Sequence, residues 1–324
     1  MGTVIGLLEH PSVRAWGKLA PNGAEPTAIA ALGDRDKAAV YRLTGVGLDG
    51  SSVVAKHCRT NTALIERAVY EQVLPDIPVT ALHYYGCTAE EDGSCWLFVE
   101  DAAGVSFTPL LEEHCVLAAR WLALLHTSAA CVASAARLPD RGPAHYMEHL
   151  RSARPAILSA AKAAARRSER AMLEQIVRQC DVIESRWHEV EEWCAPSPAT
   201  LVHGDFRPKN VHVRFDSRGA RLFAWDWEMA GWGVPAADLA SIRGLHGGEP
   251  VALRTYLDSA QASWPSLDAR SIVRLVDVGK LFRRLAAVSW CSLSLESRWQ
   301  KAVASLRVHE AALGAAIASA KWAL

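Results

Sequence analysis

The residues that decide the fold of this chain are His203-Gly204-Asp205-Phe206-Arg207-Pro208-Lys209-Asn210, which Asp226 follows sixteen positions after Asn210. Transfer of a phosphoryl group to a hydroxyl requires a carboxylate that orients the attacking O–H and oxygen ligands that hold Mg²⁺ against the nucleotide phosphates. Asp205 is the candidate for the first role, and Asn210 and Asp226 are the candidates for the second. The pattern therefore predicts a phosphoryl-transfer centre.

A β-hairpin is predicted between these candidates. Residues 210–215 and 221–226 are β-type runs, and they flank a turn-type segment centred on Arg218. In that register Asn210 lies opposite Asp226, and such cross-strand neighbours are about 5 Å apart at Cβ. This spacing suits two ligands of one Mg²⁺. We therefore expect both side chains on one face of the hairpin.

The segment 203–210 with Asp226 resembles the catalytic loop of the aminoglycoside phosphotransferase and choline kinase family, whose pattern is HGDxxxxN followed by an Asp on the next strand. A more distant similarity is to the HRDLKPEN and DFG motifs of protein kinases. The resemblance implies an α+β, two-lobed, protein-kinase-like fold. A small β-rich N-lobe over residues 1–101 is expected to bind the nucleotide, and a larger helical C-lobe over residues 102–324 is expected to hold the catalytic and acceptor sites.

The same resemblance implies the chemistry of the site. ATP, or alternatively GTP, and Mg²⁺ are the expected cofactors, and a hydroxyl of a small molecule is the expected acceptor. Asp205 would accept the hydrogen bond of the acceptor hydroxyl and align it. Arg207 stands where protein kinases have Lys. It is interpreted either as a catalytic contact to the γ-phosphate or as an exposed structural arginine.

The N-terminal part of the chain matches a nucleotide-binding lobe. Two strands are predicted around a turn at residues 47–50, and the second strand contains Val53-Val54-Ala55-Lys56. It resembles the VAIK strand, whose lysine contacts the α- and β-phosphates. A helix that begins near residue 61 carries Glu66, which the resemblance pairs with Lys56. Glu71 is the competing candidate, and its alternative interpretation is a solvated charge.

Two further segments are predicted to contact the nucleotide. Residues 96–104 resemble the strand and hinge of this family, in which the carbonyl of Glu100 and the N–H of Ala102 would bind the adenine edge. The phosphate loop is expected at residues 33–38. It contains one glycine and two aspartates, whose charges would be unfavourable beside phosphates unless they point away.

Beyond residue 104 the pattern is mainly helical. Residues 116–127 contain Leu122-Ala123-Leu124-Leu125-His126, which resembles the LAxLH helix of the family, and His126 is expected to be a packed structural histidine. Long helices are predicted between residues 144 and 194. Asp238 lies in a segment similar to GxPxxDLA, and the resemblance implies that it supports the catalytic loop without touching the substrate.

Composition limits the alternatives. The 324 residues, half of them hydrophobic, can form a sizeable core. Basic and acidic residues balance at 35 each, so no nucleic-acid or membrane partner is indicated. The eight cysteines form no CxxC pair, which favours inert thiols in a reducing compartment. No signal peptide is recognisable, and no uncharged apolar run reaches the roughly 18 residues that span a bilayer. We therefore expect a cytoplasmic protein.

The acceptor is harder to predict. Residues 229–324 hold eleven Lys or Arg against seven Asp or Glu, an excess of four positive charges, whereas a polycationic aminoglycoside requires an acidic pocket. Tryptophans at positions 227, 232, 264, 290 and 299 offer apolar surface for a sugar, nucleoside or other natural product. A neutral antibiotic or a biosynthetic intermediate is the preferred acceptor.

Other functions stay open. They are an aminoglycoside kinase proper, a kinase of a choline- or sugar-like primary metabolite, and a nucleotide-binding pseudokinase. The sequence has lost no catalytic position, which disfavours the pseudokinase. No APE-type segment follows Asp226, where Trp227-Glu228 replaces Phe-Gly, and this disfavours protein acceptors.

Overall fold

The structure is a computed structural model, and it describes residues 7–20, 23–35, 38–132, 137–217, 219–242 and 251–322. Contacts between Cα atoms divide the chain into two compact units. The first, called the β-rich unit here, comprises Met1–Thr108, Cys131–Leu138 and Asp205–Ala230. The second, called the helical unit, comprises Pro109–Ala130, Pro139–Gly204 and Gly231–Leu324. The lobe boundary expected after residue 101 stays a prediction, because this division follows contacts and not chain order.

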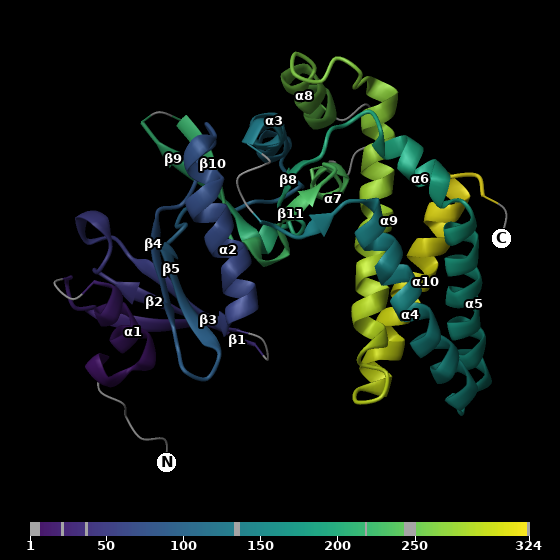
Figure 1. The fold of residues 1–324 in the computed structure, drawn as a ribbon, viewed down its shortest axis with the longest axis horizontal. Coiled ribbons are helices and arrows are strands. Elements are labelled where there is room, and N and C mark those ends of the chain that lie inside the picture. The colour runs from purple at the N-terminus through teal and green to yellow at the C-terminus, as the bar shows by residue number, and fades with distance from the viewer. Residues whose placement is uncertain are drawn as a thin grey trace. The chain divides into compact units, whose positions relative to one another are not determined.

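The β-rich unit is built on a five-stranded antiparallel sheet with the strand order β1-β2-β3-β5-β4 (Figure 1). Its strands are β1 (Ala28–Arg35), β2 (Ala38–Thr44), β3 (Val53–Arg59), β4 (Tyr84–Ala89) and β5 (Ser94–Glu100). A second sheet, with the order β10-β9-β6, contains β6 (Val105–Ser106), β9 (Val211–Asp216) and β10 (Gly219–Ala224). The α-helices of this unit are α1 (Pro11–Leu19) and α2 (Thr60–Gln72), and its 3₁₀ helices are η1 (Leu7–Glu9), η2 (Leu48–Gly50), η3 (Leu74–Asp76), η4 (Pro208–Asn210) and η5 (Trp227–Met229).

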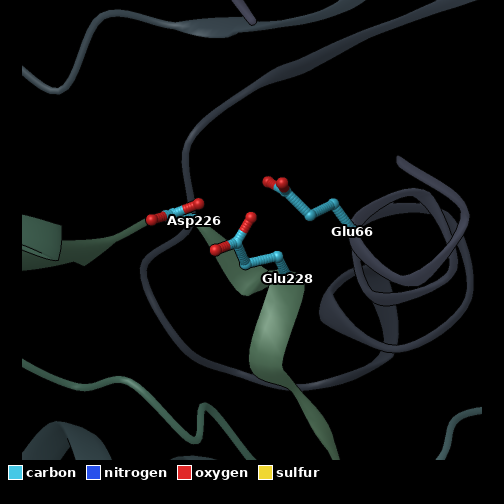
Figure 2. A group of neighbouring side chains, drawn as sticks. All are labelled: Glu66, Asp226 and Glu228. Atoms are coloured by element: carbon cyan, nitrogen blue, oxygen red, sulfur yellow. The ribbon is translucent and has the colours of Figure 1, made fainter. Parts of the chain in front are cut away.

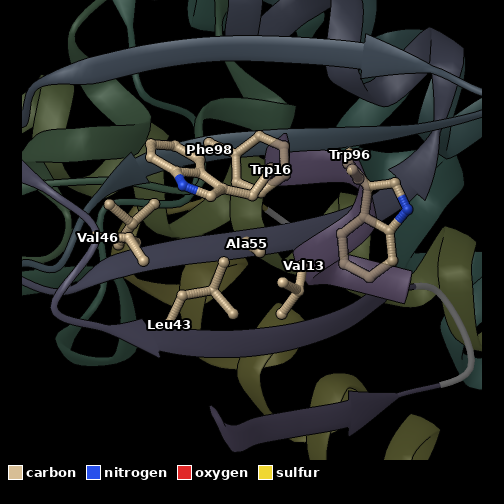
Figure 3. Packing of buried hydrophobic residues seen from close by; sticks show 9 residues of the cluster. Val13, Trp16, Leu43, Val46, Ala55, Trp96 and Phe98 are labelled. Carbon is tan, nitrogen blue, oxygen red and sulfur yellow. The ribbon is translucent and has the colours of Figure 1, made fainter. Parts of the chain in front are cut away.

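A hydrophobic core fixes α1 on the large sheet. Trp16 of α1 packs edge-on against Phe98 of β5, with ring centroids 5.3 Å apart. Leu43 of β2 and Ala55 of β3 are fully buried in the same core (Figure 3). These side chains share one face of the sheet because residues of alternate positions point the same way along a strand. The core therefore holds β3, and with it Lys56, in a rigid sheet.

The hairpin of β9 and β10 differs by one residue from the predicted register. Leu222 lies opposite Val213, and the N–H of Trp225 donates to the carbonyl of Asn210 at 3.1 Å. Asn210 therefore faces Trp225. The prediction that Asn210 lies opposite Asp226 is wrong.

The hydrophobic pattern of the sequence could not predict this register. Side chains on both faces of β10 are apolar, so either register would bury apolar residues. Leu222 and Phe223 are both buried, and the Arg214 guanidinium lies 4.2 Å from the centroid of the Phe223 ring. The turn decides the register instead. The strands end at Asp216 and resume at Gly219, whose φ of +105° favours glycine.

The helical unit contains seven long or medium helices and one short one in the part of the chain that the structure describes. They are α3 (Glu112–Val132), α4 (Pro143–Ala163), α5 (Arg167–Ser185), α6 (Trp187–Cys194), α7 (Ala236–Leu239), α8 (Val251–Ala260), α9 (Ala269–Ser292) and α10 (Trp299–Ser319). A small sheet with the order β7-β11-β8 joins β7 (Asp140–Arg141), β11 (Gly231–Gly233) and β8 (Thr200–Val202). The expected α+β fold, with a β-rich N-terminal part and a helical C-terminal part, is confirmed.

Helix α9 packs directly on the backbone of α7. Gly279 of α9 approaches α7 so closely that a Cβ built on it would lie 1.8 Å from the carbonyl oxygen of Ala236. Only a residue without a side chain fits at this position, so the contact fixes α7 and the residues that it carries.

Helix α3 is long and apolar enough to cross a membrane by length and composition alone, with a mean hydropathy of 1.5 over 18 residues. Half of that window is buried within the protein, as in the core helix of a globular unit.

Candidate active site

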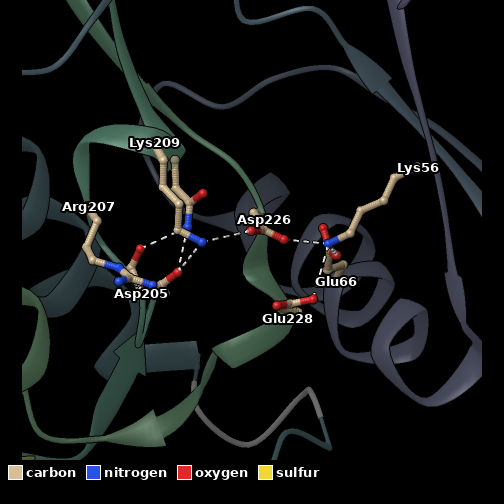
Figure 4. Close-up of polar contacts among 8 residues, drawn as sticks. Lys56, Glu66, Asp205, Arg207, Lys209, Asp226 and Glu228 are labelled. Atoms are coloured by element: carbon tan, nitrogen blue, oxygen red, sulfur yellow. Dashed lines mark hydrogen bonds and ion pairs between the residues drawn. The ribbon is translucent and has the colours of Figure 1, made fainter. Parts of the chain in front are cut away.

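The β-rich unit contains every residue that the sequence predicted for the site. Lys56 lies on β3, Glu66 on α2, and Glu100 at the end of β5. Asp205 precedes η4 in the chain, and Asp226 is the N-terminal cap of η5. Two parts of the chain that are far apart in the sequence, residues 56–66 and 205–228, thus contribute to one cluster of polar side chains (Figure 4).

Lys56 and Glu66 form a buried ion pair. The Lys56 Nζ lies 2.5 Å from Oε1 of Glu66, which is 2% exposed on the buried face of α2. Glu71, the competing candidate, instead pairs with Arg67 at 2.8 Å on the exposed side of the same helix. The structure therefore brings Lys56 together with Glu66 and leaves Glu71 outside the site.

Two more carboxylates share the Lys56 ammonium. Asp226 Oδ1 forms an ion pair with it, and Glu228 Oε2 lies 3.5 Å away. The three carboxylates can place an oxygen each within 4.8 Å of one another (Figure 2). Burial alone would lower the pKa of Lys56, but the three negative charges raise it well above its ordinary value. The ammonium is therefore charged.

One ammonium does not balance three carboxylates, so the cluster has an excess of negative charge. Burial raises the pKa of Glu66 above its ordinary value, the Lys56 charge opposes this shift, and the charge of Asp226 adds to it. Repulsion of this kind falls when a cation enters the site. The cluster is therefore suited to a ligand that brings its own cation.

Asp205 is held by the cationic residues that follow it. Arg207 forms an ion pair with Oδ1, and the Lys209 Nζ lies 2.8 Å from Oδ2. The Asn210 amide donates to the Asp205 carbonyl and to Oδ2, both at 3.0 Å. Burial raises the pKa of Asp205, but hydrogen bonds and charges from Arg207 and Lys209 outweigh it and hold the pKa below its ordinary value. Asp205 is therefore a carboxylate at neutral pH.

Local packing holds the catalytic loop. Phe206 is 1% exposed and lies 6.1 Å from Phe107, measured between ring centroids. Pro208 begins η4, where its fixed φ suits the first turn and its missing N–H costs no hydrogen bond. The Asn210 N–H donates to the Arg207 carbonyl at 2.8 Å. These contacts direct the side chains of Asp205 and Asn210 toward each other.

Asp226 leaves the hairpin at a conformation that non-glycine residues rarely adopt. Its φ is +64°, in the left-handed region. This turn directs its two carboxylate oxygens to different cations, with Oδ1 on Lys56 and Oδ2 3.8 Å from Lys209. Backbone strain of this kind is frequent at functional sites.

The predicted hinge residues follow β5. The Glu100 carboxylate accepts from Arg214 at 2.6 Å, and the Ala102 carbonyl also accepts from this guanidinium. Among the residues that the structure describes, the N–H of Ala102 has no hydrogen-bond partner. That N–H is therefore available for a ligand, and its contact with the adenine edge stays a prediction. Of the expected phosphate loop, residues 36 and 37 lie outside the described residues.

The donor atoms near Asp226 fit a hard divalent cation. Mg²⁺ prefers carboxylate and carbonyl oxygens. Asp226 offers two carboxylate oxygens, and the amide nitrogen of Asn210 is already bound to Asp205, which leaves its oxygen Oδ1 as a donor. Asn210 is also 2% exposed, as expected of an amide with a specific partner. Both predicted metal ligands thus have suitable chemistry.

Sequence reasoning missed two members of the cluster. Lys209 reaches both Asp205 and Asp226, and Glu228 reaches Lys56. A lysine in a loop and a glutamate after a strand resemble ordinary solvated charges, which is why neither was selected. The available signal was spacing, because Lys209 lies four residues after Asp205 and Glu228 two residues after Asp226.

Comparisons with known proteins bear on the family and the fold of the chain. A family model described as the phosphotransferase enzyme family matches residues 28–310. No curated protein matches the chain.

Among solved structures, the GDP complex of a mutant aminoglycoside 2′-phosphotransferase-IIIa has a TM-score of 0.60 at 16% identity, covering 92% of this chain and 95% of that chain. Choline kinase from Cryptosporidium parvum Iowa II has a TM-score of 0.57 at 11% identity, with 91% and 90% covered. Macrolide 2′-phosphotransferase type I has a TM-score of 0.56 at 20% identity, with 90% and 94% covered. At such identities the likeness establishes a kinase-like fold alone.

Proposed function

Because the chain belongs to the phosphotransferase enzyme family, and is therefore a small-molecule kinase, we propose that it transfers a phosphoryl group from ATP to a hydroxyl of a neutral or weakly charged natural product. The observation that carries the proposal is the position of Lys209, which contacts Asp205 at 2.8 Å and lies 3.8 Å from Asp226. It places the proposed acceptor-orienting carboxylate beside the proposed metal ligand. Phosphoryl transfer requires these two groups to be neighbours.

Asp205 is proposed to orient the acceptor. Its low pKa makes it a weak base, so it accepts the hydrogen bond of the hydroxyl and takes the proton late in the reaction. The acceptor oxygen bonds to the γ-phosphorus while the bond from that phosphorus to the bridging oxygen breaks, and ADP leaves. Arg207, which is paired with Asp205 and partly exposed, is proposed to contact the transferred group.

The nucleotide side of the site is proposed to use Lys56, Glu66 and the hinge. Lys56 binds phosphate oxygens and exchanges its contact with Asp226 for them, while Glu66 keeps the ammonium in place. The Glu100 carbonyl and the Ala102 N–H bind the adenine edge. Bound Mg²⁺ would neutralise charge on the transferring phosphates, with Asn210 and Asp226 as its protein ligands.

The acceptor class is supported by charge and by exposed aromatic surface. Residues 229–324 carry four excess positive charges, and Trp290 is 43% exposed. Two of the five candidate tryptophans, Trp227 and Trp264, are buried in the core and offer no surface. The solved relatives bear names that refer to aminoglycosides, choline and macrolides, so the fold leaves the acceptor open.

A cytoplasmic location and a role in antibiotic resistance accompany this proposal. ATP-dependent chemistry suits a cytoplasmic protein, and all eight cysteines are free thiols. A resistance role requires that the phosphorylated compound be an antibiotic, and the acceptor assay addresses that point directly.

The test is an acceptor screen. The protein is incubated with ATP, Mg²⁺ and a panel of macrolides, nucleosides, sugars, choline-like alcohols and aminoglycosides, and products are scored by the mass gain of one phosphoryl group. Product with wild-type protein and none with Asp205→Ala supports the proposal. Nucleotide binding without product for any acceptor supports the pseudokinase alternative instead. A product only from choline-like or aminoglycoside compounds overturns the acceptor class.

A further inference from the structure

A row of fully buried polar groups crosses the helical unit and ends at the backbone that leads into the catalytic loop. Tyr256 of α8, His126 of α3 and Asp238 of α7 are each completely buried. The Tyr256 hydroxyl lies 2.9 Å from Nδ1 of His126, and Nε2 of His126 lies 3.3 Å from Oδ2 of Asp238. Helix α3 therefore meets α7 and α8, which come more than 100 residues later in the chain, through one chain of hydrogen bonds.

The chemistry of these groups fixes the direction of each hydrogen bond. An ionised carboxylate only accepts, so Nε2 of His126 must carry the proton that it donates to Asp238. In the neutral imidazole Nδ1 is then an acceptor, and the Tyr256 hydroxyl donates to it. The row thus favours one tautomer of His126: the Asp238 carboxylate requires the proton on Nε2, and the Tyr256 hydroxyl stabilises that tautomer by donating to Nδ1.

Asp238 connects this row to the catalytic loop. Its Oδ2 accepts from the N–H of His203 at 2.7 Å, and its Oδ1 accepts from the N–H of Gly204 at 3.0 Å. Gly204 has a φ of +73°, and Asp205 is the next residue. The carboxylate of Asp238 therefore fixes the backbone turn from which Asp205 extends.

A second hydrogen bond connects α3 to the strand β8, which precedes the loop. Thr200 of β8 donates from its hydroxyl to the carbonyl of His126 at 2.6 Å. The strand that leads into the loop is thus attached to α3 at the residue that also contacts Asp238. This contact holds the backbone of α3 at His126 against the strand that leads into the loop.

Burial makes each of these hydrogen bonds consequential. A carboxylate removed from water is costly unless donors surround it, and Asp238 has three such donors in the described part of the chain. If His126 turns or changes tautomer, the carboxylate loses one donor and must shift toward others. Such a shift moves the two N–H groups that precede Asp205.

We propose that Tyr256 and His126 are positioning residues, which lock the Asp238 carboxylate and so set the backbone turn that presents Asp205 to the acceptor. The hydroxyl of Tyr256, on a helix outside the catalytic motifs, is thereby part of the catalytic apparatus without touching substrate. The effect on turnover rests on the proposed function, but the effect on the loop does not.

The first test uses Tyr256→Phe, which removes the hydroxyl and keeps the ring. The matched control is Tyr41→Phe, a tyrosine of β2 in the β-rich unit whose ring packs against His10 and Trp96. Amide hydrogen exchange at His203 and Gly204 is compared at equal global stability. Tyr256→Phe is expected to speed exchange at these two amides by about threefold to tenfold, the scale of one lost hydrogen bond. Unchanged exchange at both amides overturns the proposal whether or not the protein is an active kinase.

The second test reads the tautomer directly. Long-range ¹H–¹⁵N NMR of ¹⁵N-histidine protein, with the His126 signals assigned from His126→Gln, is expected to show the proton on Nε2 in the wild type. A wild-type proton on Nδ1 would refute the assignment, because His126 could not then donate to Asp238.

The third test separates positioning from simple stability. With an acceptor found in the screen, Tyr256→Phe is expected to lower kcat by about threefold to tenfold while the KM for ATP changes less than about twofold. His126→Gln, which keeps an N–H donor, should retain more activity than His126→Leu, which has none. If Tyr256→Phe and Tyr41→Phe lower kcat equally, Tyr256 is structural and the positioning role is excluded.

Discussion

The Lys209 ammonium lies 2.8 Å from Oδ2 of Asp205, four residues earlier in the chain. The same ammonium is 3.8 Å from Oδ2 of Asp226. Lys209 therefore stabilises the ionised form of the residue that is proposed to align the acceptor. Together with Arg207 it outweighs the effect of burial on the pKa of Asp205.

Lys209→Gln should raise the pKa of the Asp205 carboxyl, because it removes one of the two cations that hold this pKa below its ordinary value. The folded pKa lies below the unfolded one, so this group contributes stability that is present above about pH 4 and is lost as pH falls through the folded pKa. The variant should lose part of that contribution. Carboxyl ¹³C NMR titration, with the Asp205 signal assigned from Asp205→Asn, measures the pKa without an acceptor. Lys280→Gln, which breaks the exposed pair with Asp277, is the control and should leave Asp205 unchanged.

Asp205→Ala should lower kcat by at least about 10²-fold, the usual scale for a positioned acid or base. Nucleotide affinity should change little, because the proposed nucleotide contacts come from other residues. The measurement pairs steady-state kinetics with nucleotide binding by calorimetry. Near-wild-type turnover in a folded Asp205→Ala protein would contradict the proposed mechanism.

Asp226→Asn should weaken binding of Mg·ATP by far more than binding of the metal-free nucleotide, since the substitution removes a charged metal ligand. Calorimetric titrations with and without Mg²⁺ give both affinities. Asp216→Asn is a matched control, because Asp216 pairs with Arg221 at the exposed end of the hairpin. Equal losses for Mg·ATP and free ATP would show that Asp226 does not bind the metal.

Gly279→Ala should destabilise the helical unit by about 1–3 kcal/mol, the typical cost of overpacking. The new Cβ would lie 1.8 Å from the Ala236 carbonyl, so α7 must move, and α7 carries Asp238. Gly17→Ala in α1 is the contrast, because no atom lies within 4 Å of its added Cβ. It should be neutral or stabilising by up to about 1 kcal/mol. Thermal unfolding of the two variants compares them, and equal stability would contradict the close α7–α9 contact.

The sequence was most informative where one residue type has one chemical purpose. Asp205, Asn210 and Asp226 were selected as candidates because carboxylate and amide oxygens at that spacing suit metal-dependent phosphoryl transfer, and their roles stay a prediction. Glu66 was preferred to Glu71 by resemblance, and burial of Glu66 against Lys56 agrees with that choice. The fold followed from the same motifs.

The sequence predicted least well the features that depend on tertiary packing. These are the register of a strand that is buried on both faces and the contacts between helices far apart in the chain. Leu222 and Phe223 are both apolar and both buried, so β10 shows no alternation of apolar and polar residues that could fix the hairpin register. The predicted register was therefore wrong by one residue, which changes the residue of β10 that lies opposite each residue of β9. Tyr256 lies 130 positions from His126, and no local pattern connects them. Contacts between distant helices depend on tertiary packing, which periodicity alone does not contain.

The acceptor prediction follows from charge. The C-terminal segment is net positive, and bringing like charges together in a partly desolvated site is costly. A macrolide, nucleoside or other weakly charged alcohol should therefore have a higher kcat/KM than kanamycin.

The comparison is made at one ionic strength and repeated at a second, because repulsion of a polycation weakens as salt increases. Kanamycin turnover should rise with salt relative to the neutral compound. If an aminoglycoside is preferred by about tenfold or more and salt lowers its kcat/KM, the pocket attracts polycations. The acids that do so must then be sought near Glu228 or on α4 and α5.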